Sequence, residues 1–406
     1  MKYVIVLGDG MADWKIPALG NRTCLEAAKT PTLDRLAPLS EVGLCKTVPD
    51  GMKPGSDVAN MSVLGFNPHD YYTGRSPLEA VSMGINLTET DVTLRCNLVT
   101  LSDEENYADR TMVDYSAGEI TTEEAAELIA YLKNYLNDEK FTLYSGISYR
   151  HCLVVKDGVT GHALTPPHDI SDRKITDYLP KGELGEVYLK MMEKSAELLK
   201  NHPVNIKRVA AGKNPANSIW LWGEGTKPAL SPFEKERGLK GGIISAVDLV
   251  KGIGMLAGMR VIEVDGATGN YDTNFSGKAN AAADALTAGG LDFVYIHMEA
   301  PDECGHHGDS EHKIYSIEQI DGIVVPTLIE RLDAAKEQYA ILVTPDHPTP
   351  CACKTHVSEP VPYLIYSNVK NLSSGAVRYT EDEAKKSGIY VAEGHKLIER
   401  LLSIKA

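Results

Sequence analysis

Aspartate, histidine and serine side chains suited to metal binding recur beside apolar segments of this 406-residue chain. They fall in five short segments: Asp9 in LGDGM, Ser56 in PGSDVAN, Asp302 and His306 in APDECGHH, Asp346 and His347 in TPDHP, and His356 in THVSEP. Carboxylate oxygens mixed with imidazole nitrogens suit Zn²⁺ or Mn²⁺, whereas an all-oxygen set would suit Mg²⁺ or Ca²⁺ better. A serine hydroxyl is a weak nucleophile at neutral pH. No histidine lies near Ser56 in the sequence, so metal coordination is the activator that we expect.

Each of these residues also has a purely structural interpretation. Asp9 could cap a helix, Ser56 could lie in a turn after Pro54 and Gly55, and His306 could be a surface residue. Together the residues favour a site, because the carboxyl ends of parallel strands lie at one edge of a sheet, where ligands bind. Three aspartates and three histidines gathered at that edge would be costly without a neutralising metal.

Continuous apolar runs predict the strands that position these residues. The runs cover residues 3–7, 292–298, 339–344 and 361–366. Helical patterns lie between them, including residues 31–36, which begin with Thr30-Pro31, and residues 276–288, which end at Gly289-Gly290. Alternating strands and helices predict an α/β fold, in which helices cover both faces of a parallel sheet.

The middle of the chain has a different pattern. Residues 91–101 alternate with a period of two, which predicts a half-exposed strand. A helix is predicted over 121–137 with a capping box of Thr121 and Glu124, and another over 183–200. We therefore expect a core made of residues 1–89 and 226–406, with a smaller inserted α+β domain at 90–225.

Composition and charge exclude several classes of protein. The chain has 41 basic and 56 acidic residues, a net charge of −15, which disfavours binding to nucleic acid or to anionic lipid. Its 7 cysteines include no CxxC pair and predict free thiols in a reducing compartment. No apolar run approaches the roughly 18 residues of a membrane span, and the apolar N-terminal run is too short for a signal peptide. The expected location is the cytoplasm, with no membrane partner.

Longer segments carry a resemblance to a known family. They are PGSDVANMSVLGF, YTGRSPLEA, RCNLVTL, GATGNYDTNF and EAPDECGHHGD. With the order of the metal-binding residues, these segments make the chain resemble the cofactor-independent phosphoglycerate mutases, in particular their archaeal-type branch, within the alkaline phosphatase superfamily.

The resemblance implies a fold, a cofactor and a reaction. The fold would be an alkaline phosphatase-like core whose inserted domain acts as a lid. The cofactor would be two divalent metal ions, Mn²⁺ in the first place, with Zn²⁺, Co²⁺ or Mg²⁺ as alternatives. One ion would be held by Asp9, Ser56, Asp346 and His347, and the other by Asp302, His306 and His356. Ser56 would be transiently phosphorylated while a small phosphorylated substrate, 2- or 3-phosphoglycerate, is interconverted by this isomerase of glycolysis.

The substrate-binding residues and the exact substrate are less defined by the pattern. By the resemblance, basic residues hold the substrate's phosphate and carboxylate, and the candidates are Arg75, Arg95, Arg150, His151 and Lys251. Tyr115 stands where archaeal relatives would have an arginine, and TMVDYSAGEI and PANSIWLWGEG also resemble a bacterial branch proposed to be a homoserine kinase. Transfer to another small alcohol, a related metal-dependent phosphatase and a structural metal site are therefore alternatives. The sequence does not define an oligomeric state.

Overall fold

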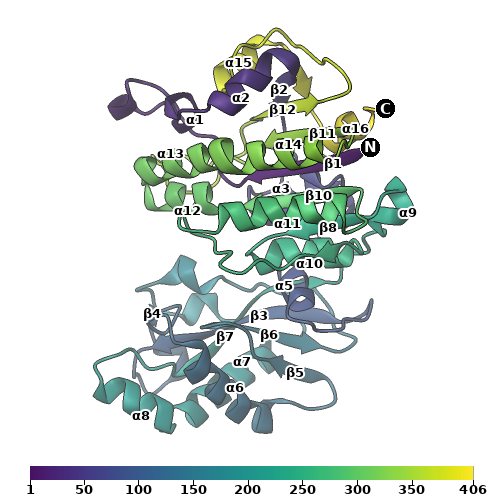
Figure 1. Ribbon diagram of the computed structural model, residues 1–406. Helices are drawn as coiled ribbons and strands as arrows, with labels where there is room; N and C mark the ends of the chain where they lie inside the picture. Colours follow the sequence, from purple (N-terminus) through teal and green to yellow (C-terminus); the bar gives the residue numbers. More distant parts are fainter. Residues whose placement is uncertain (406) are drawn as a thin grey trace. The chain divides into compact units, whose positions relative to one another are not determined.

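The computed structural model describes residues 1–405, which form two compact units (Figure 1). The first unit comprises Met1–Tyr72 and Leu230–Ala406, and the second comprises Thr73–Ala229. The second unit begins before residue 90 because helix α5 (Ser76–Ser82) packs against the strands of that unit, β3 and β7.

An eight-stranded sheet forms the centre of the first unit. Its strands are, in order across the sheet, β13 (Tyr390–Val391), β2 (Glu41–Cys45), β12 (Val361–Ser367), β11 (Tyr339–Thr344), β1 (Lys2–Gly8), β10 (Phe293–Met298), β8 (Gly241–Ile244) and β9 (Arg260–Val261). Strand β1 pairs in parallel with both β10 and β11, so that Gly8 lies opposite Met298 and Leu7 opposite Thr344. The α/β fold class is confirmed, as are the four strands predicted from apolar runs, because central strands are buried on both faces.

Strand β12 departs from the parallel pattern. It runs antiparallel to both of its neighbours, β11 and β2. Its first residues therefore lie at the same edge of the sheet as the last residues of β1, β10 and β11. Residues that precede β12 in the sequence are thereby brought to the edge at which the other strands end.

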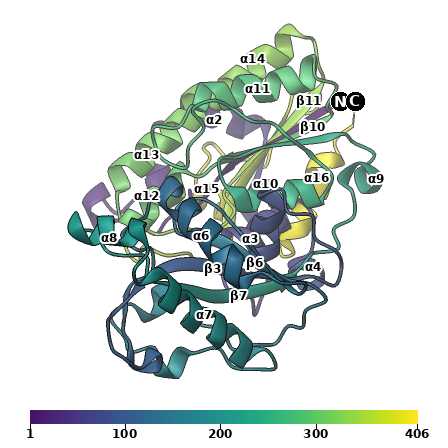
Figure 2. The same ribbon diagram turned by 90° about the horizontal axis from the view of Figure 1, so that it is seen from below.

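Helices cover both faces of this sheet. Figure 2 shows α11 (Phe275–Thr287) and α14 (Val325–Ala334) on one face, and α3 (Ser56–Val63), α10 (Asp248–Leu256) and α16 (Leu397–Leu402) on the other. The other helices of this unit are α1 (Cys24–Ala27), α2 (Pro31–Leu36), α4 (Pro68–Tyr71), α9 (Phe233–Arg237), α12 (Ala300–His307), α13 (Ser310–Gln319) and α15 (Glu381–Lys386). Helix α11 buries Ala279, Ala282, Ala283 and Leu286. Because these residues are three to four positions apart, they lie on one side of the helix, which packs against the sheet.

The second unit is an α+β structure around a smaller sheet. Its strands are β3 (Val92–Leu101), β4 (Met112–Asp114), β5 (Phe141–Tyr144), β6 (Arg150–Val155) and β7 (Ser218–Thr226), and its helices are α5, α6 (Thr122–Leu136), α7 (Gly185–Leu199) and α8 (Pro203–Ala210). Thr121 caps α6 by accepting a hydrogen bond from the Glu124 backbone N–H, which is one half of the predicted capping box, whereas the Glu124 carboxylate pairs with Arg208.

The prediction that residues 91–101 form a half-exposed strand is wrong. Every residue of β3 is buried except Arg95, which is half-buried. One face of β3 belongs to the apolar core that α6 and α7 cover. The polar residues on the other face of β3 are buried and hydrogen-bonded rather than solvated. Asn97, for example, donates to the Tyr115 carbonyl and accepts from the Trp222 indole N–H. An alternating pattern predicts exposure only where nothing packs on the polar face.

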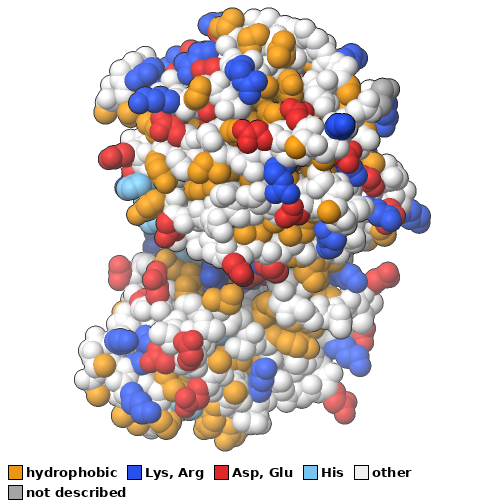
Figure 3. Space-filling view, in the orientation of Figure 1, with side chains coloured by type: hydrophobic (Ala, Val, Ile, Leu, Met, Phe, Trp, Pro, Cys, Tyr) orange, Lys and Arg blue, Asp and Glu red, His pale blue; other side chains and the backbone are white. Residues whose placement is uncertain are grey.

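The surface carries a mixture of charges. On the face shown in Figure 3, lysine and arginine side chains are interspersed with aspartate and glutamate. Among the described residues, no helix is both long enough and apolar enough to cross a lipid bilayer.

Candidate active site

Loops at one edge of the large sheet carry the predicted metal-binding residues. Asp9 follows β1, Asp302 lies in the first turn of α12 directly after β10, and Asp346 and His347 follow β11. His356 precedes β12, and the reversed direction of that strand brings this histidine to the same edge. All the residues predicted to bind metal thus lie within the first unit.

A first group of ligand atoms comes from Asp9, Asp346 and His347. One atom from each side chain lies within 4.8 Å of the others, and all three residues are buried. The His347 Nε2 atom is 3.2 Å from Asp346 Oδ2 and 3.7 Å from Asp9 Oδ1. Gly10 has a φ of +60°, and a Cβ there would come within 2.5 Å of Asp302 Oδ1, so glycine lets this loop pass beside the ligands.

Ser56 lies beside this group as the first residue of α3. Its Oγ atom is 3.2 Å from His347 Nε2. Asn60, one turn further along the helix, donates from its side-chain amide to both the Ser56 carbonyl and Asp346 Oδ2, at 2.9 Å in each case. The helix that carries the serine is therefore tied to a carboxylate of the group.

A second group of ligand atoms comes from Asp302, His347 and His356, so His347 belongs to both groups, and His306 lies beside this second group. Asp302 and His306 are four residues apart on α12, so they lie on the same face of the helix, and His306 Nε2 is 3.2 Å from Asp302 Oδ2. His356 Nε2 is 3.5 Å from Asp302 Oδ1 and 2.9 Å from His306 Nε2. Two imidazole nitrogens 2.9 Å apart can be joined by one hydrogen bond, or both can face a shared cation.

The electrostatics of the site also fit a cation. Burial, and then the carboxylates of Asp346 and Asp302, raise the pKa of Asp9 well above its ordinary value. Asp9 Oδ1 is buried and has no hydrogen-bond partner among the described residues. Burial would also raise the pKa of Asp302, but hydrogen bonds from His306 and His356 hold it well below the usual range. A divalent ion would neutralise the crowded carboxylates and occupy the unpartnered oxygen.

The histidines of the site differ in their protonation. The hydrogen bond to Asp302 raises the pKa of His306 to about 9, whereas burial lowers that of His347. Burial also lowers the pKa of His297 to about 3, which keeps that buried imidazole neutral. A neutral imidazole is the form that binds a metal or donates one ring hydrogen to a neighbour.

The predicted substrate-binding residues are brought together only in part. Arg75 and Arg95 converge on the half-buried Glu79, with Nε to carboxylate distances of 2.7 and 2.9 Å. Burial would raise the pKa of Glu79, but Arg95, Arg75 and Arg150 together lower it. The Arg95 guanidinium also lies 4.2 Å from the centre of the Trp222 ring. Glu79 is thus the common partner of Arg75 and Arg95, and the charge of Arg150 also acts on it within the second unit.

His151 and Lys251 have other surroundings. His151 is buried in β6, its Nδ1 accepts from the Gly146 backbone N–H, and burial lowers its pKa to about 3. Lys251 belongs to α10 in the first unit and forms an ion pair with Glu263 at 2.8 Å.

Proteins of one family are similar to this chain. A family model described as 2,3-bisphosphoglycerate-independent phosphoglycerate mutase matches residues 37–205. A protein of that name from Methanosarcina barkeri is 47% identical over 406 residues, covering 100% of both chains. This chain belongs to that family. A Geobacter sulfurreducens relative named as a probable member is 47% identical over 99% of this chain and 100% of its own.

Solved structures support the fold of this family member. A protein from Pyrococcus horikoshii matches with a TM-score of 0.82 at 27% identity, covering 99% of this chain and 96% of its own. A cofactor-independent phosphoglycerate mutase from Thermoplasma acidophilum matches with a TM-score of 0.66 at 25% identity, covering 100% of each chain.

Several residues that support the mutase-family site were not predicted from the sequence. Thr349 donates a hydrogen bond to Asp302, and the Asp346 carboxylate accepts from the backbone N–H groups of Gly10 and His347. His297 Nε2 lies 2.8 Å from Asp9 Oδ2. Two signals in the sequence could have pointed to supporting residues. One is the position of Asn60, one helical turn after Ser56, and the other is His297, a lone histidine within the apolar strand DFVYIHM.

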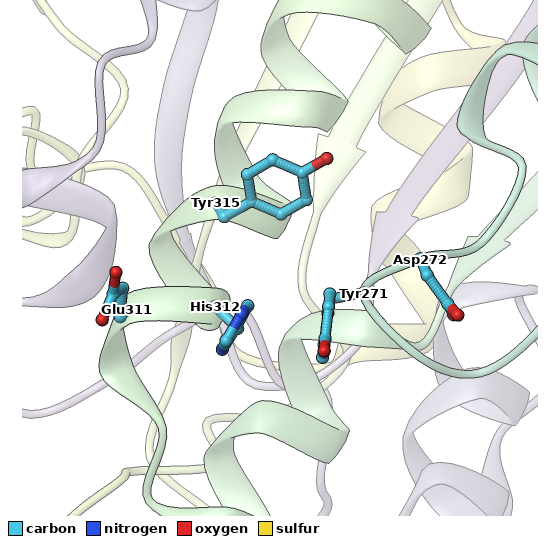
Figure 4. A pocket seen from close by; sticks show the side chains of 5 residues that line it. All are labelled: Tyr271, Asp272, Glu311, His312 and Tyr315. Carbon is cyan, nitrogen blue, oxygen red and sulfur yellow. The ribbon is translucent and has the colours of Figure 1, made fainter.

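An open cavity of about 280 Å³ lies apart from these groups and is lined by Tyr271, Asp272, Glu311, His312 and Tyr315. Figure 4 shows the rings of Tyr271 and His312 edge-on and facing each other, with centroids 4.0 Å apart. None of the predicted site residues lines this cavity, and the candidate active site lies instead where the ligand atoms of the two groups converge.

Proposed function

We propose that this protein interconverts 2-phosphoglycerate and 3-phosphoglycerate by way of a phosphorylated Ser56. The observation that carries this proposal is the position of Ser56 Oγ, 3.2 Å from His347 Nε2 and beside the carboxylates of Asp9 and Asp346. A serine placed beside a cluster of metal-binding side chains fits a nucleophile better than it fits a turn residue.

The residues of the two groups fit two divalent cations, and Mn²⁺ is our first choice because the donors mix carboxylate oxygen with imidazole nitrogen. Asp9, Ser56, Asp346 and His347 would hold one ion, and Asp302, His306 and His356 the other. When bound, the ions would stabilise negative charge on the serine oxygen and on the phosphoryl oxygens.

The chain's own residues then account for the transfer. Ser56 Oγ attacks the phosphorus in line, a P–Oγ bond forms, and the bond from phosphorus to the substrate oxygen breaks. The proton lost by the serine is balanced by the proton that the released glycerate oxygen gains. Return of the phosphoryl group to the other glycerate hydroxyl regenerates Ser56. The start of α3 favours the anionic adduct, because the positive end of the helix dipole lies there.

Retention of glycerate between the two steps separates a mutase from a phosphatase. Glycerate carries a carboxylate, and the phosphorylated substrate carries a second anionic group, so both need cationic partners. We propose that the arginine cluster of Arg75, Arg95 and Arg150 supplies them, with His151 and Lys251 as further candidates. Sequestration by closure of a lid domain would prevent loss of glycerate to water.

A paired assay tests this function. Purified protein loaded with Mn²⁺ is given 3-phosphoglycerate in an enolase-coupled assay, while free phosphate is measured in the same sample. In parallel, the protein is incubated with ATP and homoserine, and phosphohomoserine is measured. We expect 2-phosphoglycerate formation without comparable release of phosphate. Phosphohomoserine alone, or stoichiometric release of phosphate from 3-phosphoglycerate, would contradict the proposal.

A further inference from the structure

The two carboxylate oxygens of Asp9 have different surroundings. Oδ2 lies 2.8 Å from His297 Nε2, and the side chain of His297 is fully buried. Oδ1 is also buried but has no hydrogen-bond partner among residues 1–405. One oxygen is thus held by the protein, and the other is left available to a ligand.

The second ring nitrogen of His297, Nδ1, also has a partner. This atom lies 3.2 Å from Ser245 Oγ, and the same Oγ accepts a hydrogen bond of 2.9 Å from the Val247 backbone N–H. The Ser245 hydroxyl hydrogen has two acceptors within reach, the Val247 carbonyl at 3.4 Å and His297 Nδ1 at 3.2 Å, and the contact with Nδ1 is the shorter. An imidazole that accepts at Nδ1 carries its hydrogen on Nε2, and it therefore donates to Asp9 Oδ2.

The backbone of His297 is hydrogen-bonded within the large sheet. His297 lies in β10 and pairs in register with Leu7 of β1, two residues before Asp9. The buried Lys278 of α11 donates to the His297 carbonyl at 3.2 Å, and Ser245 follows directly after β8, the strand on the other side of β10. The donor and the carboxylate that receives it are therefore fixed by neighbouring strands of one sheet.

The other two carboxylates of the site are held in a different way. Asp346 accepts from backbone N–H groups and from Asn60, and Asp302 accepts from the Thr349 hydroxyl. Asp302 and Asp346 also lie beside imidazoles, but those rings, His306, His356 and His347, belong to the predicted metal-binding residues. The ring that contacts Asp9 Oδ2, His297, is not one of them, and its second nitrogen faces the Ser245 hydroxyl.

We propose that Ser245 and His297 are positioning residues that fix the hydrogen of the imidazole on Nε2 and hold Asp9 so that Oδ1 faces the metal. This inference rests on the proposed role of Asp9 as a metal-binding residue. Removing a side chain that hydrogen-bonds to a metal-binding residue, and so orients it, weakens metal affinity by about 10–100-fold.

Two substitutions of His297 separate this role from simple packing. In His297→Gln the amide nitrogen reaches the position of Nε2 and can still donate to Asp9, whereas in His297→Asn the shorter side chain ends near the position of Nδ1. Mn²⁺ binding to metal-depleted protein is measured by calorimetry, and unfolding in urea is measured on the same samples. We expect His297→Asn to weaken binding by about 10–100-fold and His297→Gln to restore most of it. Equal affinity in the two variants would overturn the proposal.

Ser245→Ala tests the contact between Ser245 and His297 without altering the imidazole of His297. It leaves the imidazole in place and removes the hydroxyl that selects its hydrogen position, so we expect Mn²⁺ affinity to fall by a smaller factor than in His297→Asn. An unchanged affinity would contradict the role of Ser245. This variant also covers the case in which His297→Asn does not fold.

Asp9→Asn, measured beside these variants, separates this inference from the proposed function. If Asp9→Asn loses Mn²⁺ while the His297 variants bind normally, only the positioning role is wrong. If Asp9→Asn also binds normally, the proposed metal-binding role of Asp9 is wrong. His202→Asn is the control for the general cost of replacing a buried imidazole. His202 is a buried histidine of the second unit, where it caps α8.

Discussion

His306 and His356 bring their Nε2 atoms to within 2.9 Å of each other, although they are 50 residues apart in the chain. One histidine comes from α12 and the other from the segment before β12. Both also approach the Asp302 carboxylate. Without a cation, one ring must donate its Nε2 hydrogen to the Nε2 of the other ring, beside the buried carboxylate of Asp302. The predictions below follow from this arrangement and from its neighbours.

Ser56→Ala should abolish turnover while both metal ions remain bound. The variant removes the nucleophile but leaves Asp9, Asp346 and His347 in place, so we expect kcat to fall by about 1000-fold or more. Metal analysis and the enolase-coupled assay measure the two quantities. Mass spectrometry of acid-quenched wild-type protein should locate phosphate on Ser56. An active alanine variant, or an adduct mapped to another residue, would exclude the phosphoserine mechanism.

Asp302→Asn should lower metal content and activity together. The asparagine keeps the size of the side chain but loses the charge that both His306 and His356 approach, so the second ion should bind more than about 100-fold more weakly. Titration of Mn²⁺ followed by activity at each point measures the effect. Activity that recovers at high Mn²⁺ is expected. Full occupancy at wild-type affinity would show that Asp302 does not bind metal.

The metal-free protein should lose stability as the pH rises from about 6.5 to about 9. The hydrogen bond to Asp302 raises the pKa of His306 from its ordinary value of 6.5 to about 9, so its contribution to stability is complete below about pH 6.5 and is lost as the pH rises through about 9. Asp9 acts in the same direction, because its folded pKa is also raised. The urea midpoint of metal-depleted protein at several pH values measures this effect.

His306→Gln provides the control for that pH dependence. The variant should show a flatter dependence over the same range, because it cannot take up the proton. Mn²⁺ affinity of the wild type should rise over this range, since the ion competes with that proton. A dependence that is identical in the two proteins would assign the effect to other groups.

Lys313→Met should destabilise the fold by about 3–5 kcal/mol. The ammonium group is fully buried, 2.9 Å from Asp13 Oδ2 and within hydrogen-bond distance of the carbonyls of Ala12 and Thr349. Its removal leaves the Asp13 carboxylate buried without a counter-charge. The double variant Lys313→Met/Asp13→Asn should be less destabilised than Lys313→Met alone, and chemical denaturation measures both. Additive losses would mean that the two charges do not interact.

The sequence by itself determined the chemistry and the main strands. Continuous apolar runs predicted β1, β10, β11 and β12, because a strand that is buried on both faces has apolar side chains on both of them. The spacing of Asp302 and His306 placed both on one face of a helix, because residues four apart are neighbours there. Residue types alone indicated a divalent cation, since mixed carboxylate and imidazole donors are seldom gathered without one.

Only the tertiary structure decided how these parts meet. Strand direction is not encoded in a local pattern, and the antiparallel pairing of β12 is what brings His356 to Asp302. The burial of β3 depends on α5 and on the core beneath α6 and α7, which its alternating pattern does not reveal. The contact of His297 with Asp9 joins residues 288 positions apart. Such contacts arise from strand order and register, which the whole chain fixes together and no single segment determines.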